Sequence, residues 1–492
     1  MTVPYEVIVV GSGSGGGVVA SRLSEDPATE VLLLEAGPDP GDDVPDAVRY
    51  PRMGSGVNEY DWGYLDRTAK NAVPRGRIVG GSSCVNATVA LRGQPQDYDA
   101  WAALGLRSWS WSECLPYFNR LEDDRDYGDR AYHGRGGPIH VERAPLNEFQ
   151  QRLRAAILEV GHAAADDLNE PGAVGVGPIP RNIKNGERQS TLLTYIATAR
   201  GRPNLTLRAD TLVDTVVVRN GHATGVRLAG GEVIEGRKVV LAAGAYNSPQ
   251  LLQRSGIGSR EVLGRLGLDV QVELNGVGEN LLDHVSTLIV LNTGQLGPGG
   301  IVPLGPALKL RTEPTLVVDD VKFTFLPGDL FGMPGLSALY IEVSNCESQG
   351  VVRAVSRDPK AEPFIDHRYF SNGRDLDRIV AAATVAFEVA NVLADTTECE
   401  LLLPDVQTSR DPDALREHFS SFHATDYHPS GTLRMGAADD EMAVVDDHCR
   451  LRGVDNLYVA DASVMPTIPR ANINLPTMMI GERVSDFVRA EI

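Results

Sequence analysis

Three glycines near the start of the chain have the spacing of a dinucleotide site. Gly11, Gly13 and Gly16 form a GxGxxG pattern: the first glycine allows a tight turn, the second lets the backbone approach a pyrophosphate, and the third lets a helix pack against a strand. Glu35, nineteen residues after Gly16, could accept hydrogen bonds from an adenosine ribose and would disfavour a 2′-phosphate. The alternative is a structural glycine turn that binds nothing.

Two strands and a helix must hold this loop in place. Residues 7–10 are apolar and β-branched and predict a buried strand, and residues 18–23 predict the first turns of a helix. Residues 31–34 predict a second strand that ends at Glu35. The phosphates of a dinucleotide would then lie at the partly positive N-terminus of the helix.

Later segments predict further strands and helices. Residues 205–218 and 223–228 alternate in polarity and predict a β-meander. Residues 238–245 predict a second parallel strand that ends in a glycine turn, followed by a helix with Ser248 as N-cap and Pro249 at its first position. Residues 457–460 predict a strand, and residues 478–488 a final helix.

Composition excludes several classes of protein. A chain of 492 residues predicts about two to four domains or one large discontinuous pair. Its net charge of -20 would repel nucleic acid and anionic membranes. The sequence has neither a run of eighteen apolar residues nor a signal-peptide pattern, so we expect no membrane span and a cytoplasmic location. Its five cysteines have no CxxC spacing, and no metal site is predicted.

Several motifs, in one order along essentially the whole chain, resemble the glucose-methanol-choline (GMC) oxidoreductase family. They are residues 11–16 with Glu35, then 75–93, 244–258, 276–284, 428–436 and 461–482. The resemblance implies FAD rather than NAD and an α/β fold: a discontinuous Rossmann-like FAD-binding domain and a second, α+β substrate domain built on an antiparallel sheet. The predicted FAD-binding domain comprises residues 1–145, 200–290 and 441–492, and the predicted substrate domain comprises residues 146–199 and 291–440.

By position, the resemblance also implies a set of cofactor contacts. The residues carried over are Gly11, Gly13, Ser14, Gly16, Glu35, Gly81, Ser82, Asn86, Val213, Asp461, Ala462, Pro476 and Thr477. Relatives that bind flavin covalently often do so through a histidine immediately before the residue that matches Asn86. Here that residue is Val85, so we expect FAD to be bound non-covalently.

The resemblance implies that His428 and Asn472 are the catalytic pair. Asn474 is an alternative for the second role, whereas His284 is expected to support the site and His423 to be a surface or support residue. A neutral imidazole, with an ordinary pKa of about 6.5, can take a proton from an alcohol. The amide can donate a hydrogen bond to the alkoxide without titrating.

The expected function is FAD-dependent oxidation of a primary alcohol, or of a sugar or polyol hydroxyl, to an aldehyde. His428 would abstract the proton, and flavin N5 would accept the hydride. Oxygen, a quinone or a redox protein would reoxidise the flavin, and a cationic substrate is left open. The alternatives are a flavin-bound electron-relay or binding protein, and an FAD lyase or decarboxylase on the same fold.

Overall fold

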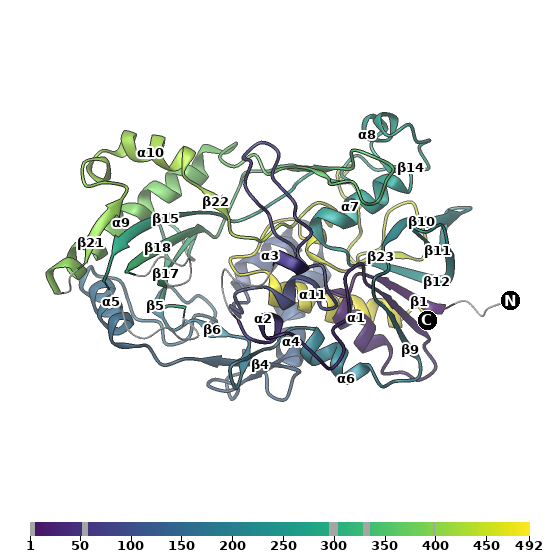
Figure 1. Ribbon diagram of the computed structural model, residues 1–492, viewed down its shortest axis with the longest axis horizontal. Coiled ribbons are helices and arrows are strands. Elements are labelled where there is room, and N and C mark those ends of the chain that lie inside the picture. The colour runs from purple at the N-terminus through teal and green to yellow at the C-terminus, as the bar shows by residue number, and fades with distance from the viewer. Residues whose placement is uncertain (1–4, 52–57, 295–303, 328–334, 397–398) are drawn as a thin grey trace.

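Two sheets, one toward each end of the long axis, organise the chain (Figure 1). The computed structural model describes residues 5–51, 58–294, 304–327, 335–396 and 399–492. Residues 1–4 and 52–57 of the predicted FAD-binding domain lie outside the described residues, as do residues 295–303, 328–334 and 397–398 of the predicted substrate domain.

The first sheet has a parallel core with an antiparallel extension. Its order is β10-β11-β12-β1-β2-β9, with β23 also paired to β12. Strands β12, β1, β2 and β9 pair in parallel, as does β23 with β12, whereas β10, β11 and β12 form an antiparallel meander. The strands are β1 (Tyr5–Val10), β2 (Val31–Leu34), β9 (Leu205–Arg208), β10 (Val213–Arg219), β11 (His222–Leu228), β12 (Val233–Leu241) and β23 (Leu457–Val459).

The second sheet is antiparallel throughout, with the order β21-β15-β18-β17-β16-β5 and β22 also paired to β15. Its strands are β5 (Gly175–Gly177), β15 (Val285–Asn292), β16 (Ala307–Leu310), β17 (Val321–Pro327), β18 (Leu336–Val343), β21 (Glu400–Leu403) and β22 (Ala424–Thr425). A parallel Rossmann-like sheet beside an antiparallel one is the predicted fold class, which is therefore confirmed.

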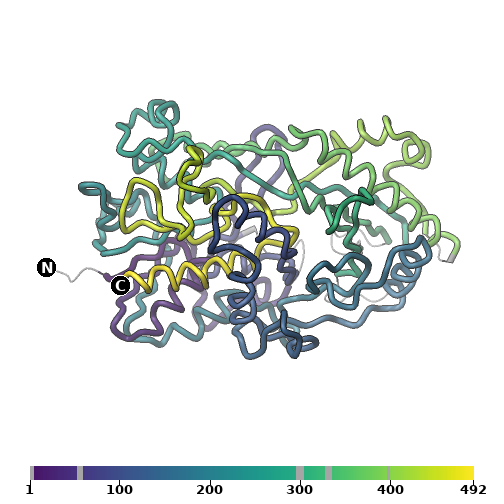
Figure 2. Tube along the Cα trace, turned by 180° about the vertical axis from the view of Figure 1, so that it is seen from behind, coloured from purple at the N-terminus to yellow at the C-terminus, as the bar shows by residue number. Residues whose placement is uncertain are grey.

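Helices cover both sheets. Helix α11 packs against α1 and α4 beside the first sheet, and Figure 2 shows it passing from that end toward the middle of the molecule. Helix α9 lies against β15, β17 and β18, with α5 and α10 packed on it. The helices are α1 (Gly16–Leu23), α2 (Asp46–Arg49), α3 (Pro95–Ala103), α4 (Trp111–Leu121), α5 (Glu148–Glu159), α6 (Ala197–Ala199), α7 (Gly244–Arg254), α8 (Arg260–Arg265), α9 (Gly373–Thr396), α10 (Pro412–Ser421) and α11 (Asn474–Arg489).

The remaining strands are short. They are β3 (Glu122–Asp124), β4 (Ile139–Arg143), β6 (Pro180–Arg181), β7 (Ile183–Lys184), β8 (Glu187–Arg188), β13 (Ile257–Gly258), β14 (Val272–Glu273), β19 (Val351–Arg353) and β20 (Phe364–Asp366). In the part of the chain that the structure describes, no helix combines the length and apolar character that crossing a membrane needs.

The predicted start of α7 is wrong. The helix begins at Gly244, so Ser248 and Pro249 lie inside it. The Ser248 hydroxyl accepts from the Ala243 N–H at 3.1 Å and donates to Asp461 Oδ2 at 2.6 Å. Pro249 has no N–H for the Ala245 carbonyl, and the Thr432 hydroxyl donates to that carbonyl at 2.7 Å. A contact from a distant segment thus lets the helix begin before the proline.

Two other boundaries differ from prediction. Strand β9, predicted to open the meander, pairs in parallel with β2, and the meander begins at β10. Helix α11 begins at Asn474, four residues before its predicted start. By contrast, the predicted parallel strand is present, because the second half of β12 pairs with β1 from Gly236↔Tyr5 to Leu241↔Val10.

Candidate active site

One cavity of about 730 Å³ extends from the glycine loop to the second sheet. It is lined by both members of the predicted catalytic pair and by most of the predicted cofactor residues: Gly11, Gly13, Ser14, Glu35, Gly81, Ser82, Asn86, Val213, Asp461, Ala462, Thr477, His428 and Asn472. Gly16 and Pro476 are not among the lining residues. The structure therefore brings together residues from both ends of the sequence, from Gly11 to Thr477.

The glycines of the loop serve different purposes. Gly11 has a φ of +95°, which favours glycine. A Cβ on Gly16 would lie 1.9 Å from the Gly11 carbonyl oxygen, so this glycine is needed for helix α1 to pack against the loop. A Cβ on Gly13 would meet only the Cα of Gly81, at 3.9 Å. Gly13 therefore leaves room on the cavity side for a close ligand.

Glu35 lies at the end of β2, where its carboxylate fixes the glycine loop. Its Oε2 accepts from the backbone N–H of Ser12 at 3.0 Å and from the Ser12 hydroxyl at 2.6 Å. Its Oε1 accepts from Gly37 N–H at 2.9 Å. Burial raises the pKa of Glu35, and the Ser12 hydroxyl is the main opposing influence. A carboxylate offers about four acceptor positions, so one stays available for a ligand hydroxyl.

Asn474 belongs to the glycine-loop end of the cavity. Its Oδ1 accepts from the Ser14 hydroxyl at 2.7 Å, and its buried Nδ2 has no hydrogen-bond partner among the described residues. An unpartnered amide donor beside the open side of Gly13 fits a pyrophosphate or a flavin carbonyl. The donors, the glycine opening and the size of the cavity together fit FAD.

The backbone around His428 is held by a left-handed residue and two hydrogen bonds. Tyr427, the residue before it, has a φ of +64°, a conformation that costs of order 1–3 kcal/mol and concentrates at functional sites. The Tyr427 N–H donates to Thr425 Oγ1 at 2.8 Å, and the His428 N–H donates to Asp283 Oδ1 at 2.8 Å. These contacts fix the backbone that carries the imidazole.

The two predicted catalytic side chains meet in the cavity. His428 Nε2 lies 3.2 Å from Asn472 Nδ2. The structure thus places Asn472, and not Asn474, beside the imidazole. Burial lowers the pKa of His428 to about 4, partly offset by the charge of Glu342, so the ring is neutral at physiological pH.

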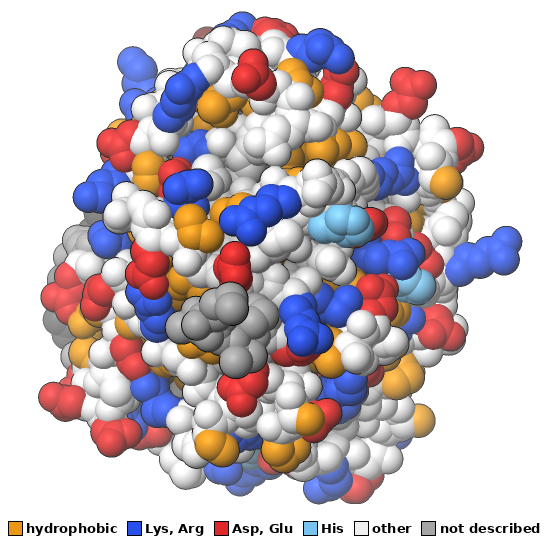
Figure 3. Space-filling view, turned by 90° about the vertical axis from the view of Figure 1, so that its right-hand side faces the viewer, with side chains coloured by type: hydrophobic (Ala, Val, Ile, Leu, Met, Phe, Trp, Pro, Cys, Tyr) orange, Lys and Arg blue, Asp and Glu red, His pale blue; other side chains and the backbone are white. Residues whose placement is uncertain are grey.

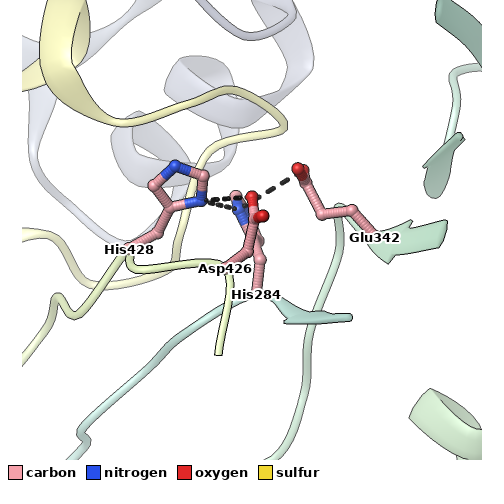
Figure 4. Close-up of side chains that lie close together, drawn as sticks. All are labelled: His284, Glu342, Asp426 and His428. Atoms are coloured by element: carbon pink, nitrogen blue, oxygen red, sulfur yellow. Dashed lines mark hydrogen bonds and ion pairs between the residues drawn. The ribbon is translucent and has the colours of Figure 1, made fainter. Parts of the chain in front are cut away.

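Three further titratable groups surround the other side of the imidazole (Figure 4). His428 Nδ1 lies 2.9 Å from His284 Nδ1 and 3.0 Å from Asp426 Oδ2. His284 Nδ1 is also 3.5 Å from Glu342 Oε1. Burial lowers the pKa of His284 to about 3 and raises the pKa values of Asp426 and Glu342. The cluster therefore holds two neutral imidazoles next to carboxyl groups that resist ionisation.

A lysine completes this cluster. Lys322 Nζ lies 2.7 Å from Glu342 Oε2 and donates to Asn472 Oδ1 at 2.8 Å. The ligand atoms of His284, Glu342, Asp426 and His428 lie within 4.8 Å of one another, a spacing that could hold a metal ion. Because the Lys322 ammonium already supplies a positive charge beside the carboxyl groups, we assign no metal here.

Sequence reasoning missed Lys322, Glu342 and Asp426. The available signal was the alternation in β17, where Lys322 and Thr324 are polar residues between apolar ones and both line the cavity. His423, expected to be a surface or support residue, also lines the cavity and packs its ring edge-on against Tyr369.

A glycine-cradled nucleotide cavity closed by an antiparallel sheet with an imidazole–amide pair defines a flavoprotein oxidoreductase. Two sequence patterns, both described as GMC oxidoreductase, match residues 5–286 and 346–481. The chain belongs to the GMC oxidoreductase family and acts on CH–OH donors. The family, fold and enzyme class predicted from the sequence are confirmed.

Individual relatives support this assignment. The chain is 36% identical to an oxygen-dependent choline dehydrogenase 1 of Chromohalobacter salexigens, over 99% of this chain and 95% of that protein. It is 35% identical to an oxygen-dependent choline dehydrogenase of Klebsiella pneumoniae, over 99% of this chain and 96% of that protein. The crystal structure of pyridoxine 4-oxidase from Mesorbium loti superposes with a TM-score of 0.89 at 28% identity, covering 99% of each chain.

Proposed function

We propose that this protein oxidises an uncharged primary alcohol to an aldehyde with non-covalently bound FAD. The observation that carries the proposal is the 3.2 Å approach of Asn472 Nδ2 to His428 Nε2 in the wall of the cavity. One nitrogen can accept a proton and the other can donate a hydrogen bond, and both are needed at the oxygen of an alcohol.

The two side chains divide the work on the hydroxyl group. An alcohol held between them donates its proton to His428 Nε2 and accepts a hydrogen bond from Asn472 Nδ2. The amide opposes the negative charge that develops on the oxygen, and it does so without titrating. FAD, when bound, supplies the acceptor for the hydride that leaves the carbon. Oxygen, a quinone or a redox protein is proposed to take the electrons onward.

Non-covalent binding of FAD is proposed from the residue before Asn86. Val85 lines the cavity and has no nucleophilic atom. Precipitating the holoenzyme with acid should release all the yellow colour into the supernatant. Colour that stays with the pellet would show a covalent bond.

Replacing the base is the direct test. His428→Ala should keep its FAD content, while anaerobic reduction of the bound flavin by alcohol slows about 10²–10⁴-fold, the usual contribution of a positioned base. Stopped-flow absorbance of the flavin measures the rate. His222→Ala, which removes an exposed histidine on β11, is the control and should react normally. Near-native reduction in His428→Ala would remove this residue from the role.

A panel of alcohols without oxygen separates the alternative functions. An electron relay would keep its flavin oxidised in every alcohol. A lyase or decarboxylase would consume its substrate while the flavin stays oxidised. The proposed enzyme bleaches with its substrate and forms one aldehyde per flavin reduced.

The charge of the substrate can be tested with an isosteric pair. Choline is a candidate because the relatives named above are choline dehydrogenases, but the carboxyl groups that could bind its cation are engaged. Glu342 contacts Lys322, and Asp426 accepts from the Tyr340 hydroxyl. We therefore expect 3,3-dimethyl-1-butanol, the uncharged isostere of choline, to show a kcat/KM at least as high as that of choline. A tenfold preference for choline would contradict this expectation.

A further inference from the structure

Lys322 occupies an unusual place for a lysine. It lies on β17, directly opposite Glu342 on β18, and only 6% of it is exposed. Its ammonium contacts just two described side chains by ion pair or hydrogen bond, Glu342 at 2.7 Å and Asn472 at 2.8 Å. A buried lysine is costly unless it is paired, and these two contacts offset that cost.

The chemistry of an ammonium determines how the Asn472 amide is oriented. Lysine offers only donors, so the atom that faces it must be the acceptor Oδ1. The amide nitrogen then points the other way, toward His428 Nε2. Without Lys322 the amide could rotate by half a turn and present its oxygen to the alcohol, and two acceptors would then face one hydroxyl.

The orientation of the Asn472 amide also fixes which nitrogen of the His428 ring carries the proton. An amide nitrogen is also only a donor, so the nitrogen of His428 that it contacts must be unprotonated. The ring proton then lies on Nδ1, which faces Asp426 Oδ2 and His284 Nδ1 (Figure 4).

We propose that Lys322 is a positioning residue: it fixes the Asn472 amide so that Nδ2 meets the reacting oxygen, and thereby keeps His428 Nε2 as the free base. This inference rests on the proposed roles of His428 and Asn472. Its positive charge also polarises the amide and makes the N–H a stronger donor. No motif of the sequence identifies this lysine.

The first test compares two lysines of the same sheet. Lys322→Met should retain FAD and slow anaerobic flavin reduction about 10- to 100-fold, somewhat less than the loss of an entire oxyanion donor. Lys309→Met is the matched control, because Lys309 is a buried lysine on the adjacent strand β16, paired with Asp319, and does not line the cavity. Lys322→Arg keeps the donors and the charge and should recover most of the rate. Equal slowing in Lys309→Met and Lys322→Met would overturn the proposal.

The decisive test is a double-mutant cycle. If Lys322 acts through Asn472, then adding Lys322→Met to Asn472→Ala should change the reduction rate less than twofold, because the group that it orients is gone. A further tenfold loss in the double variant would show an independent role and overturn the proposal. If Lys322→Met does not fold, Lys322→Leu, which also has no donor, is used in the same cycle.

The two hypotheses fail in distinguishable ways. A near-native rate for His428→Ala would contradict the proposed function, whatever the lysine variants do. Additive effects in the cycle, with a slow His428→Ala, would contradict only the role of Lys322.

Discussion

Burial changes what the catalytic imidazole can do. At its ordinary pKa of about 6.5, a histidine base would lose activity in mildly acidic solution, and the sequence alone leads to that expectation. In the structure, desolvation lowers the pKa of His428 to about 4. A group with a lowered pKa stays in its basic form until the pH falls near that value, so the base is active across the physiological range.

This shift predicts the pH profile of the half-reaction. Flavin reduction at saturating alcohol should be constant at pH values more than one unit above 4, and should fall as the pH approaches 4 and the imidazolium forms. Stopped-flow pH jumps from neutral buffer avoid acid unfolding during the measurement. A rate that rises through an ionisation near 6.5 would show that the ring keeps its ordinary pKa of about 6.5 in the enzyme.

At the level of elements, the sequence predicts local patterns, but it does not predict which distant residues face each other in the fold. The loop from Gly11 to Gly16, the strands around it and the pair His428 and Asn472 follow from spacing and family motifs. Lys322 is not predicted from the sequence, because its place in the site depends on the register of β17 against β18, which puts it opposite Glu342. The start of α7 is not predicted correctly, because Thr432, far along the chain, donates to the Ala245 carbonyl that Pro249 leaves without a donor.

The turn between β1 and α1 gives a matched pair of glycine variants. Gly16→Ala should destabilise the apoprotein, because its Cβ would lie 1.9 Å from the Gly11 carbonyl oxygen. Gly13→Ala should leave the apoprotein as stable as the native chain but weaken FAD binding, because its methyl group would enter the space left for the ligand. Thermal unfolding of the apoproteins and flavin titration measure the two effects. Equal FAD affinity in Gly13→Ala and the native chain would contradict the predicted role of this glycine.

At the scale of the whole molecule, the segment that carries His428 joins the two halves. Strand β22, which precedes His428, pairs with β15 of the second sheet, and residues 431–435, which follow it, bind the half built on the first sheet. The N–H groups of Gly431, Leu433 and Met435 donate to the carbonyls of residues 462–464, which follow Asp461.

Figure 3 shows acidic and basic side chains interspersed over the end of the molecule that carries the first sheet. The domain boundaries and the cytoplasmic location stay predictions.

The hydrogen bond from the Thr432 hydroxyl to the Ala245 carbonyl belongs to the segment that carries His428, and its contribution to stability can be measured. Thr432→Val should lower the stability of the holoenzyme by about 1–3 kcal/mol, the usual cost of a buried carbonyl left without a donor, because Thr432 is fully buried and donates to Ala245. Thermal unfolding checks this. Thr384→Val is the control, since Thr384 lies on the exposed side of α9. Equal melting temperatures for Thr432→Val and the control would show that the bond contributes nothing.

This attachment also bears on how such an enzyme can diverge. The residues that follow the proton acceptor are hydrogen-bonded to the nucleotide-binding half, whereas side chains such as Leu288, Thr324 and Leu326 belong to strands of the opposite wall. Point changes on those strands can reshape the chamber while the acceptor keeps its place. Related enzymes can therefore change their alcohol substrate through side chains on these strands while they keep the same proton acceptor.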